Sequence, residues 1–86
     1  MEVILQTDEM DELSRQDPKT KGDGGFQSLM VSLQKKLDKT SGKLSLSAED
    51  MEKIPRYAFE YKNGGWQNRL MTIFSRTLGS GLDGKA

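Results

Sequence analysis

Five polar side chains that suit contacts with nucleic acid recur along one side of segment 66–78. If this segment is helical, at about 100° per residue, its outward arc carries one amide, two hydroxyl and two guanidinium groups and no acid: Asn68, Arg69, Thr72, Ser75 and Arg76. Such groups match phosphate oxygens and base edges, whereas an ordinary solvated face mixes Glu with Lys. We therefore predict a nucleic-acid contact surface. Its residues are Arg56, Lys62, Asn68, Arg69, Thr72 and Arg76.

The order of elements before this helix favours the same interpretation. Residues 51–61 are expected to be helical and 62–65 to form a tight turn, so 66–78 is compatible with the second helix of a helix-turn-helix. A plainer alternative stays open, because helix pairs with short turns are common and polar residues can simply cover an outer face. The net charge of zero also counts against strong non-specific binding.

The residue types needed for catalysis or metal binding are missing or unsuitably spaced. The chain has no Cys and no His, which removes thiolate ligands and the commonest general base. Glu49, Asp50 and Glu52 lie together in the first turn of an expected helix, where the helix dipole stabilises acidic side chains. The two Gly-Gly pairs lack the spacing of phosphate-binding loops. We predict a non-enzymatic protein without cofactor or metal ion.

Charge is distributed unevenly along the chain. Residues 1–17 contain six acidic residues and one basic residue, whereas 19–79 contain 11 basic and six acidic residues. The two parts can attract each other or face different partners. The second alternative predicts a protein-interaction module, an adaptor or inhibitor, whose acidic N-terminal segment docks on a basic partner. An exposed apolar helix stripe could equally pair with a partner helix.

The elements that must position these groups follow from two similar stretches, each with a Gly-Gly pair, an aromatic residue, Gln and an amphipathic helix. The first spans 24–37 and the second 64–78. Apolar residues at helical spacing predict helices over 26–38 and 66–78, and a third helix from Ala48 is kinked at Pro55. The predicted fold class is mainly α: a small three-helix domain with a pseudo-repeated helix pair. Residues 2–7 are compatible with a short N-terminal strand.

We predict three parts along the chain: an acidic, partly flexible N-terminal segment over 1–23, a compact helical domain over 24–79 and a flexible tail over 80–86. The two similar helices are expected to pack together through aromatic and aliphatic side chains: Phe26, Leu33, Trp66, Leu70 and Phe74. A domain of this size is marginally stable and has no disulfides, so we expect a homo-oligomer such as a dimer. The sequence contains no run of roughly 20 apolar residues, so we expect no membrane contact and a cytoplasmic protein.

Overall fold

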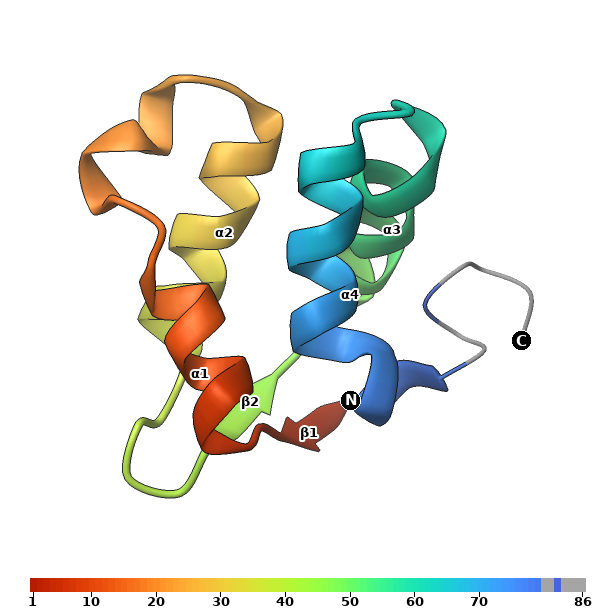
Figure 1. Cartoon of the computed structure of the whole chain (residues 1–86). Helices are drawn as coiled ribbons and strands as arrows, with labels where there is room; N and C mark the ends of the chain where they lie inside the picture. The colour runs from red at the N-terminus through yellow and green to blue at the C-terminus, as the bar shows by residue number, and fades with distance from the viewer. Residues whose placement is uncertain (80–81, 83–86) are drawn as a thin grey trace.

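Helices form most of the chain in the computed structural model, which describes residues 1–79 and 82 (Figure 1). Helical segments hold 69% of the residues, so the predicted mainly α class is confirmed. In chain order the elements are β1 (Glu2–Ile4), α1 (Thr7–Ser14), the 3-10 helix η1 (Pro18–Gly22), α2 (Gly25–Lys36), β2 (Lys43–Ser45), α3 (Ala48–Pro55), the π-helix η2 (Arg56–Glu60) and α4 (Gly64–Leu78). α1 and α3 run one way along the molecule, and α2 and α4 run the other way (Figure 1).

The two predicted amphipathic helices form close to their expected bounds. The stripe of α2 is buried through Phe26, Leu29, Met30 and Leu33, and the stripe of α4 through Leu70, Ile73 and Phe74. α4 begins where the Asn63 side chain accepts a hydrogen bond from the Trp66 backbone N–H at 3.1 Å. It ends at Gly79, whose φ of 53° is left-handed and suits glycine.

The N-terminal residues differ from the partly flexible segment expected over 1–23. β1, α1 and η1 occupy most of it, and Leu13 of α1 is fully buried. A capping box starts α1, because the Gln6 side chain and the Glu9 carboxylate each bond the other's backbone N–H. α1 packs along α4, so the N-terminal residues are part of the core and do not form a separate lead.

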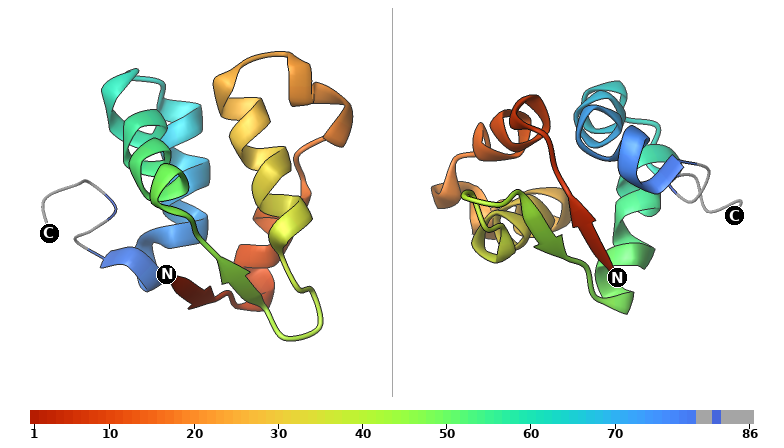
Figure 2. Two further views of the ribbon diagram at one scale, coloured as in Figure 1. Left: turned by 180° about the vertical axis from the view of Figure 1, so that it is seen from behind. Right: turned by 90° about the horizontal axis from the view of Figure 1, so that it is seen from below.

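A small sheet closes one end of the molecule. β1 and β2 pair antiparallel with Val3 opposite Leu44, and both side chains are buried. The expected N-terminal strand is thus present, and the alternating stretch after Gly42 supplies its partner. Figure 2 shows this sheet at the end opposite the turn that leads into α4.

Pro55 does not separate α3 from the segment that follows. Because proline donates no backbone hydrogen bond, one bond of the helical ladder is missing, and the chain continues directly into the wider π-helix η2. The helical run then ends at Tyr61 and Lys62, and Lys62 has a left-handed φ of 53°. This conformation turns the chain into α4.

The core joins all of these elements, with one difference from the expected helix pair. Phe26 stacks on Trp66 with ring centroids 4.9 Å apart, and Leu33, Leu70 and Phe74 belong to the same core. The neighbours along α4 are α1 and η2, however, while α2 lies against η1 and α1. Of the tail predicted over 80–86, only Leu82 is described, and it is buried in the core. The other tail residues lie outside the described part.

Candidate functional site

The predicted contact face of α4 is partly covered by α1. The Arg76 guanidinium donates to both carboxylate oxygens of Glu9, at 2.7 and 3.1 Å, and to the Ile4 carbonyl at 2.6 Å. Two turns nearer the start of α4, Arg69 donates to the Gln16 side chain at 2.6 Å and lies 3.7 Å from the Glu12 carboxylate. These contacts fasten the acidic helix to the basic one.

The Glu9–Arg76 pair is electrostatically strong. Burial raises the pKa of Glu9, but hydrogen bonds from Arg76 and from the Gln6 backbone, with the Arg76 charge, more than offset it. The net pKa therefore lies below its ordinary value of 4.5. The hydrogen bond with Glu9 raises the pKa of Arg76 in turn. Both side chains remain charged at neutral pH, and each is the other's partner.

The other predicted contact residues are dispersed. Asn68 and Thr72 are exposed on α4, and the Thr72 hydroxyl donates to the Asn68 carbonyl at 2.8 Å. Arg56 begins η2, where it forms ion pairs with Glu52 and Glu60. Lys62 is exposed in the turn before α4. The structure brings Arg69 and Arg76 together with acids, not into a continuous cationic face.

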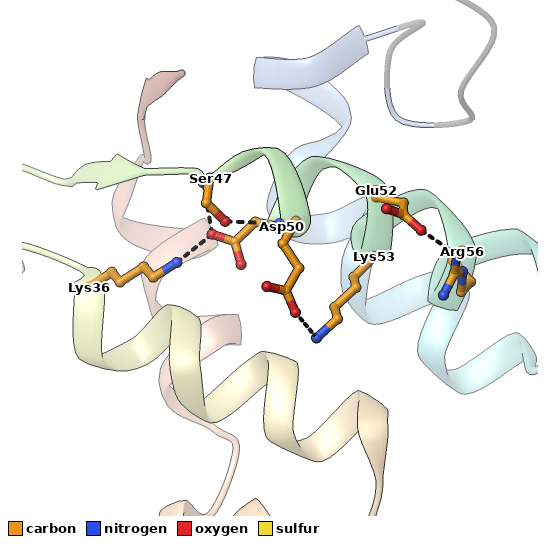
Figure 3. Close-up of polar contacts among 7 residues, drawn as sticks. Lys36, Ser47, Asp50, Glu52, Lys53 and Arg56 are labelled. Atoms are coloured by element: carbon orange, nitrogen blue, oxygen red, sulfur yellow. Dashed lines mark hydrogen bonds and ion pairs between the residues drawn. The ribbon is translucent and has the colours of Figure 1, made fainter.

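A polar cleft between α2 and α3 gathers a second set of charged groups (Figure 3). Its volume is about 150 Å³, and Lys36 crosses it to reach Asp50 at 2.5 Å. Burial raises the pKa of Asp50, but hydrogen bonds from Lys36 and Ser47 lower it overall. Lys53 pairs with Glu49 at 2.6 Å within the same cleft. Both cations of this cleft are thus paired with a carboxylate. The Lys36–Asp50 pair links α2 to α3.

A different group of cations lacks such partners. Seven basic residues form ion pairs with acids: Arg15, Lys36, Lys43, Lys53, Arg56, Arg69 and Arg76. Within residues 1–79, five lysines form none: Lys19, Lys21, Lys35, Lys39 and Lys62. The first four, which come from η1, the C-terminal end of α2 and the turn after it, are called the lysine surface below.

The packing of η1 on α2 creates the lysine surface. The Gln34 side chain donates to the carbonyls of Leu13 and Gln16 at 2.9 and 2.6 Å, which fastens α2 to the end of α1. A cavity of about 120 Å³ beside it is lined by Lys39 and by Pro18 of η1. The distant parts of the chain that carry these lysines are thus held next to each other.

Lys21 and Lys35 are neighbours within this surface. A side-chain hydrogen bond with Lys21 and the repulsion of its charge lower the pKa of Lys35. The acids nearest to these lysines in sequence are Asp17, Asp23 and Asp38. The Asp17 carboxylate accepts the Lys19 backbone N–H at 2.9 Å, and the Asp38 carboxylate accepts the Thr40 backbone N–H at 2.9 Å. An anion placed between two such amines would relieve their repulsion.

Sequence reasoning missed this surface because Lys19 and Lys21 are 14 or more residues away from Lys35 and become its neighbours only through folding. The lysines gathered around the end of α2, Lys35 and Lys39, are the available signal, and they resemble any solvated helix end.

Other classes of site find no support in the described part of the chain. No group of three or more His, Cys, Asp or Glu side chains within residues 1–79 and 82 is arranged to hold a metal ion. No helix described there has the length and apolar character needed to cross a membrane. Comparison with protein-family models, curated proteins and solved structures finds no match to this chain.

Proposed function

We propose that this chain is a small non-enzymatic binding protein that contacts the phosphate backbone of nucleic acid through the lysine surface. The observation that supports this proposal is the pairing pattern of its cations. Four lysines on η1, on α2 and in the turn after α2 form no ion pair among the described residues, while seven other basic residues form one. The proposal keeps the cytoplasmic location expected from the sequence.

The proposal moves the contact away from α4. Phosphate oxygens approaching Arg69 or Arg76 would meet the carboxylates of Glu12 and Glu9, which already occupy those guanidinium groups. Repulsion between these carboxylates and phosphate disfavours a major-groove role for the face. Asn68 and Thr72 stay exposed, but neither carries a charge.

Lysine–phosphate contacts predict a salt-dependent affinity with little sequence preference. Four contacts give a slope of about −3.6 in log affinity against log salt for duplex DNA, a loss of roughly 150-fold between 50 and 200 mM salt. Lysine on phosphate positions the protein but reads no base. We therefore expect similar binding to unrelated sequences.

Fluorescence anisotropy with a labelled duplex at 50 and 200 mM salt tests the proposal. Removing two of the four contacts with Lys21→Gln and Lys35→Gln together should halve the salt slope, to about −1.8. Lys43→Gln with Lys53→Gln is the matched control, because it removes the same two charges from lysines that are paired with Glu2 and Glu49. Absence of binding at 50 mM salt to both the duplex and a labelled single strand, or equal slopes for the double variant and the control, would overturn the proposal.

The protein-interaction alternative rests on a narrower observation. Glu9 and Glu12 turn toward α4, so only Asp8 and Asp11 of α1 stay exposed without an ion pair among the described residues. The large exposed apolar side chains come from three separate segments: Met1 and Ile4, Tyr61, and Met71. If Asp8→Asn with Asp11→Asn abolishes capture of a protein partner, and Lys21→Gln with Lys35→Gln leaves it unchanged, this alternative replaces the proposal. Homo-oligomerisation also stays a prediction, to be measured by light scattering at two concentrations.

A further inference from the structure

Four aromatic rings form a continuous cluster where α2 and α4 begin. Phe26 stacks on Trp66 at 4.9 Å with planes 6° apart, and Tyr57 stacks on Tyr61 at 5.0 Å with planes 12° apart. The two pairs meet edge to face, since Trp66 lies 5.7 Å from both tyrosine rings at about 75°. Arg69 completes the cluster, with its guanidinium 5.6 Å from the Phe26 ring centre.

Tyr61 is the outermost ring of this cluster. It is 54% exposed, whereas Phe26 is buried and Tyr57 and Trp66 are half-buried. Tyr57 covers one face of the Tyr61 ring, and Tyr57 is itself held in place by close packing against Gly25. The exposed ring is therefore a supported platform and not a loosely placed side chain.

One unpaired cation adjoins this platform. Lys62 follows Tyr61 directly, is exposed and has no ion pair with any described residue. η1, which carries Lys19 and Lys21, packs on the other helix of this end, α2 (Figure 1). An exposed ring beside a free ammonium group suits a ligand that carries both planar rings and negative charge.

We infer that Tyr61 stacks an unpaired base and that the nucleic acid bound by this protein is single-stranded. The inference rests on the proposed function, because the lysine surface and Lys62 would hold the backbone while the ring takes a base. Every base has a flat face, so stacking on Tyr61 is tolerant of sequence. Bases inside a duplex already stack on their neighbours, so only a splayed base can reach the ring.

Binding of a labelled twelve-nucleotide oligothymidylate, compared with a twelve-base-pair duplex, tests the inference. The Tyr61→Ala variant lacks the ring on which one base would stack. It should therefore bind oligothymidylate roughly 5- to 150-fold more weakly than the parent, while its affinity for the duplex changes by less than about twofold. Tyr61→Phe keeps the ring and should bind like the parent. Met71→Ala is the matched control, because Met71 is also an exposed apolar side chain, at 38%, outside the aromatic cluster.

Trp66 supplies a second readout without a label. It is the only tryptophan in the chain and lies 5.7 Å from Tyr61, so a base stacked on Tyr61 should quench its fluorescence. The quenching should disappear in Tyr61→Ala while circular dichroism shows an unchanged helix content.

The outcomes separate this inference from the proposed function. If both probes bind, lose affinity with Lys21→Gln and Lys35→Gln and ignore Tyr61→Ala, the inference is wrong and the proposed function stands. If neither probe binds at 50 mM salt, the proposed function fails and the inference fails with it. Tyr61-dependent binding of a proline-rich peptide, without oligonucleotide binding, would also overturn the inference, because exposed tyrosines recognise such peptides.

Discussion

The Glu9–Arg76 pair offers a direct test of how the N-terminal residues hold α4. Glu9 is 4% exposed, and its carboxylate accepts two hydrogen bonds from Arg76 and one, at 2.7 Å, from the Gln6 backbone N–H. Glu9→Gln preserves the size of the side chain but removes its charge, and one of its terminal groups becomes a donor facing other donors. We expect this change to lower the free energy of unfolding.

The expected loss is about 2 kcal/mol, because hydrogen bonds to a charged group contribute about 1.5–3 kcal/mol and glutamine can keep a weaker neutral one. The Arg76 side chain is 44% exposed, so water can take over part of its hydrogen bonding and keeps the loss below that of a fully buried pair. For a domain of this size, such a loss lowers Tm by roughly 8–16 °C.

The contribution of Glu9 depends on pH with a definite sign. The unfolded carboxyl titrates near its ordinary value of 4.5, and the folded one titrates lower. As the pH falls, the unfolded state takes up the proton first, so this stabilisation is complete above 4.5 and is lost as the pH falls through the folded pKa. Asp50 also has a lowered pKa, but it titrates in both proteins and cancels in the comparison.

Urea unfolding of the parent chain and Glu9→Gln at about pH 7 and about pH 3 measures both effects, with the slope m checked for constancy. Asp11→Asn is the control, because Asp11 is an exposed acid of the same helix and forms no ion pair with any described residue. The difference between parent and Glu9→Gln should shrink on acidification, while Asp11→Asn should match the parent at both pH values. Equal midpoints for all three proteins at neutral pH would refute the role given to this pair.

Two further predictions concern backbone conformation, and both are read from urea unfolding midpoints. Lys62 has a left-handed φ of 53°, which costs a non-glycine residue about 1 kcal/mol, so Lys62→Gly should stabilise the fold or leave it unchanged; a clear loss of stability would contradict this. Gly25→Ala should cost about 1–3 kcal/mol, because the new Cβ would lie 1.8 Å from the Tyr57 hydroxyl. Gly64→Ala should be tolerated, since a Cβ there meets nothing within 4 Å, and equal damage at both glycines would count against the packing described.

The helices that could be predicted from the sequence are those whose burial follows from their own pattern. α2 and α4 each carry a continuous apolar stripe, so their periodicity was sufficient to find them. α1 has only Met10 and Leu13 at helical spacing, and its remaining buried side chain is Glu9. A buried acid cannot be recognised from local pattern, because its burial depends on Arg76, 67 residues away.

The contact face predicted on α4 shows the same limitation. The absence of acids from this face was correctly observed, but it had two explanations: an external anionic partner, or an acidic segment of the same chain. The acidic charge of residues 1–17 and the basic charge of residues 19–79 are compatible with an acidic segment of the same chain. The ion pairs of Arg69 and Arg76 with acids of α1 agree with this explanation. Charge pattern gives the sign of a partner and not its location.

The cations of this chain therefore fall into three groups according to where their partners come from. Lys53 of α3 and Arg56 of η2 pair with Glu49 and Glu52, each one turn earlier in the same helical run. On α4, Arg69 and Arg76 find theirs on α1, and Lys36 likewise crosses from α2 to α3. The four lysines of the lysine surface form no ion pair with any described carboxylate, although Asp17, Asp23 and Asp38 are close to them in sequence. An unpaired exposed lysine costs little by itself, but several held together repel one another, and an anionic ligand lowers that repulsion. The surface where a partner would gain most is thus the one formed by η1 and α2, not the polar face of α4.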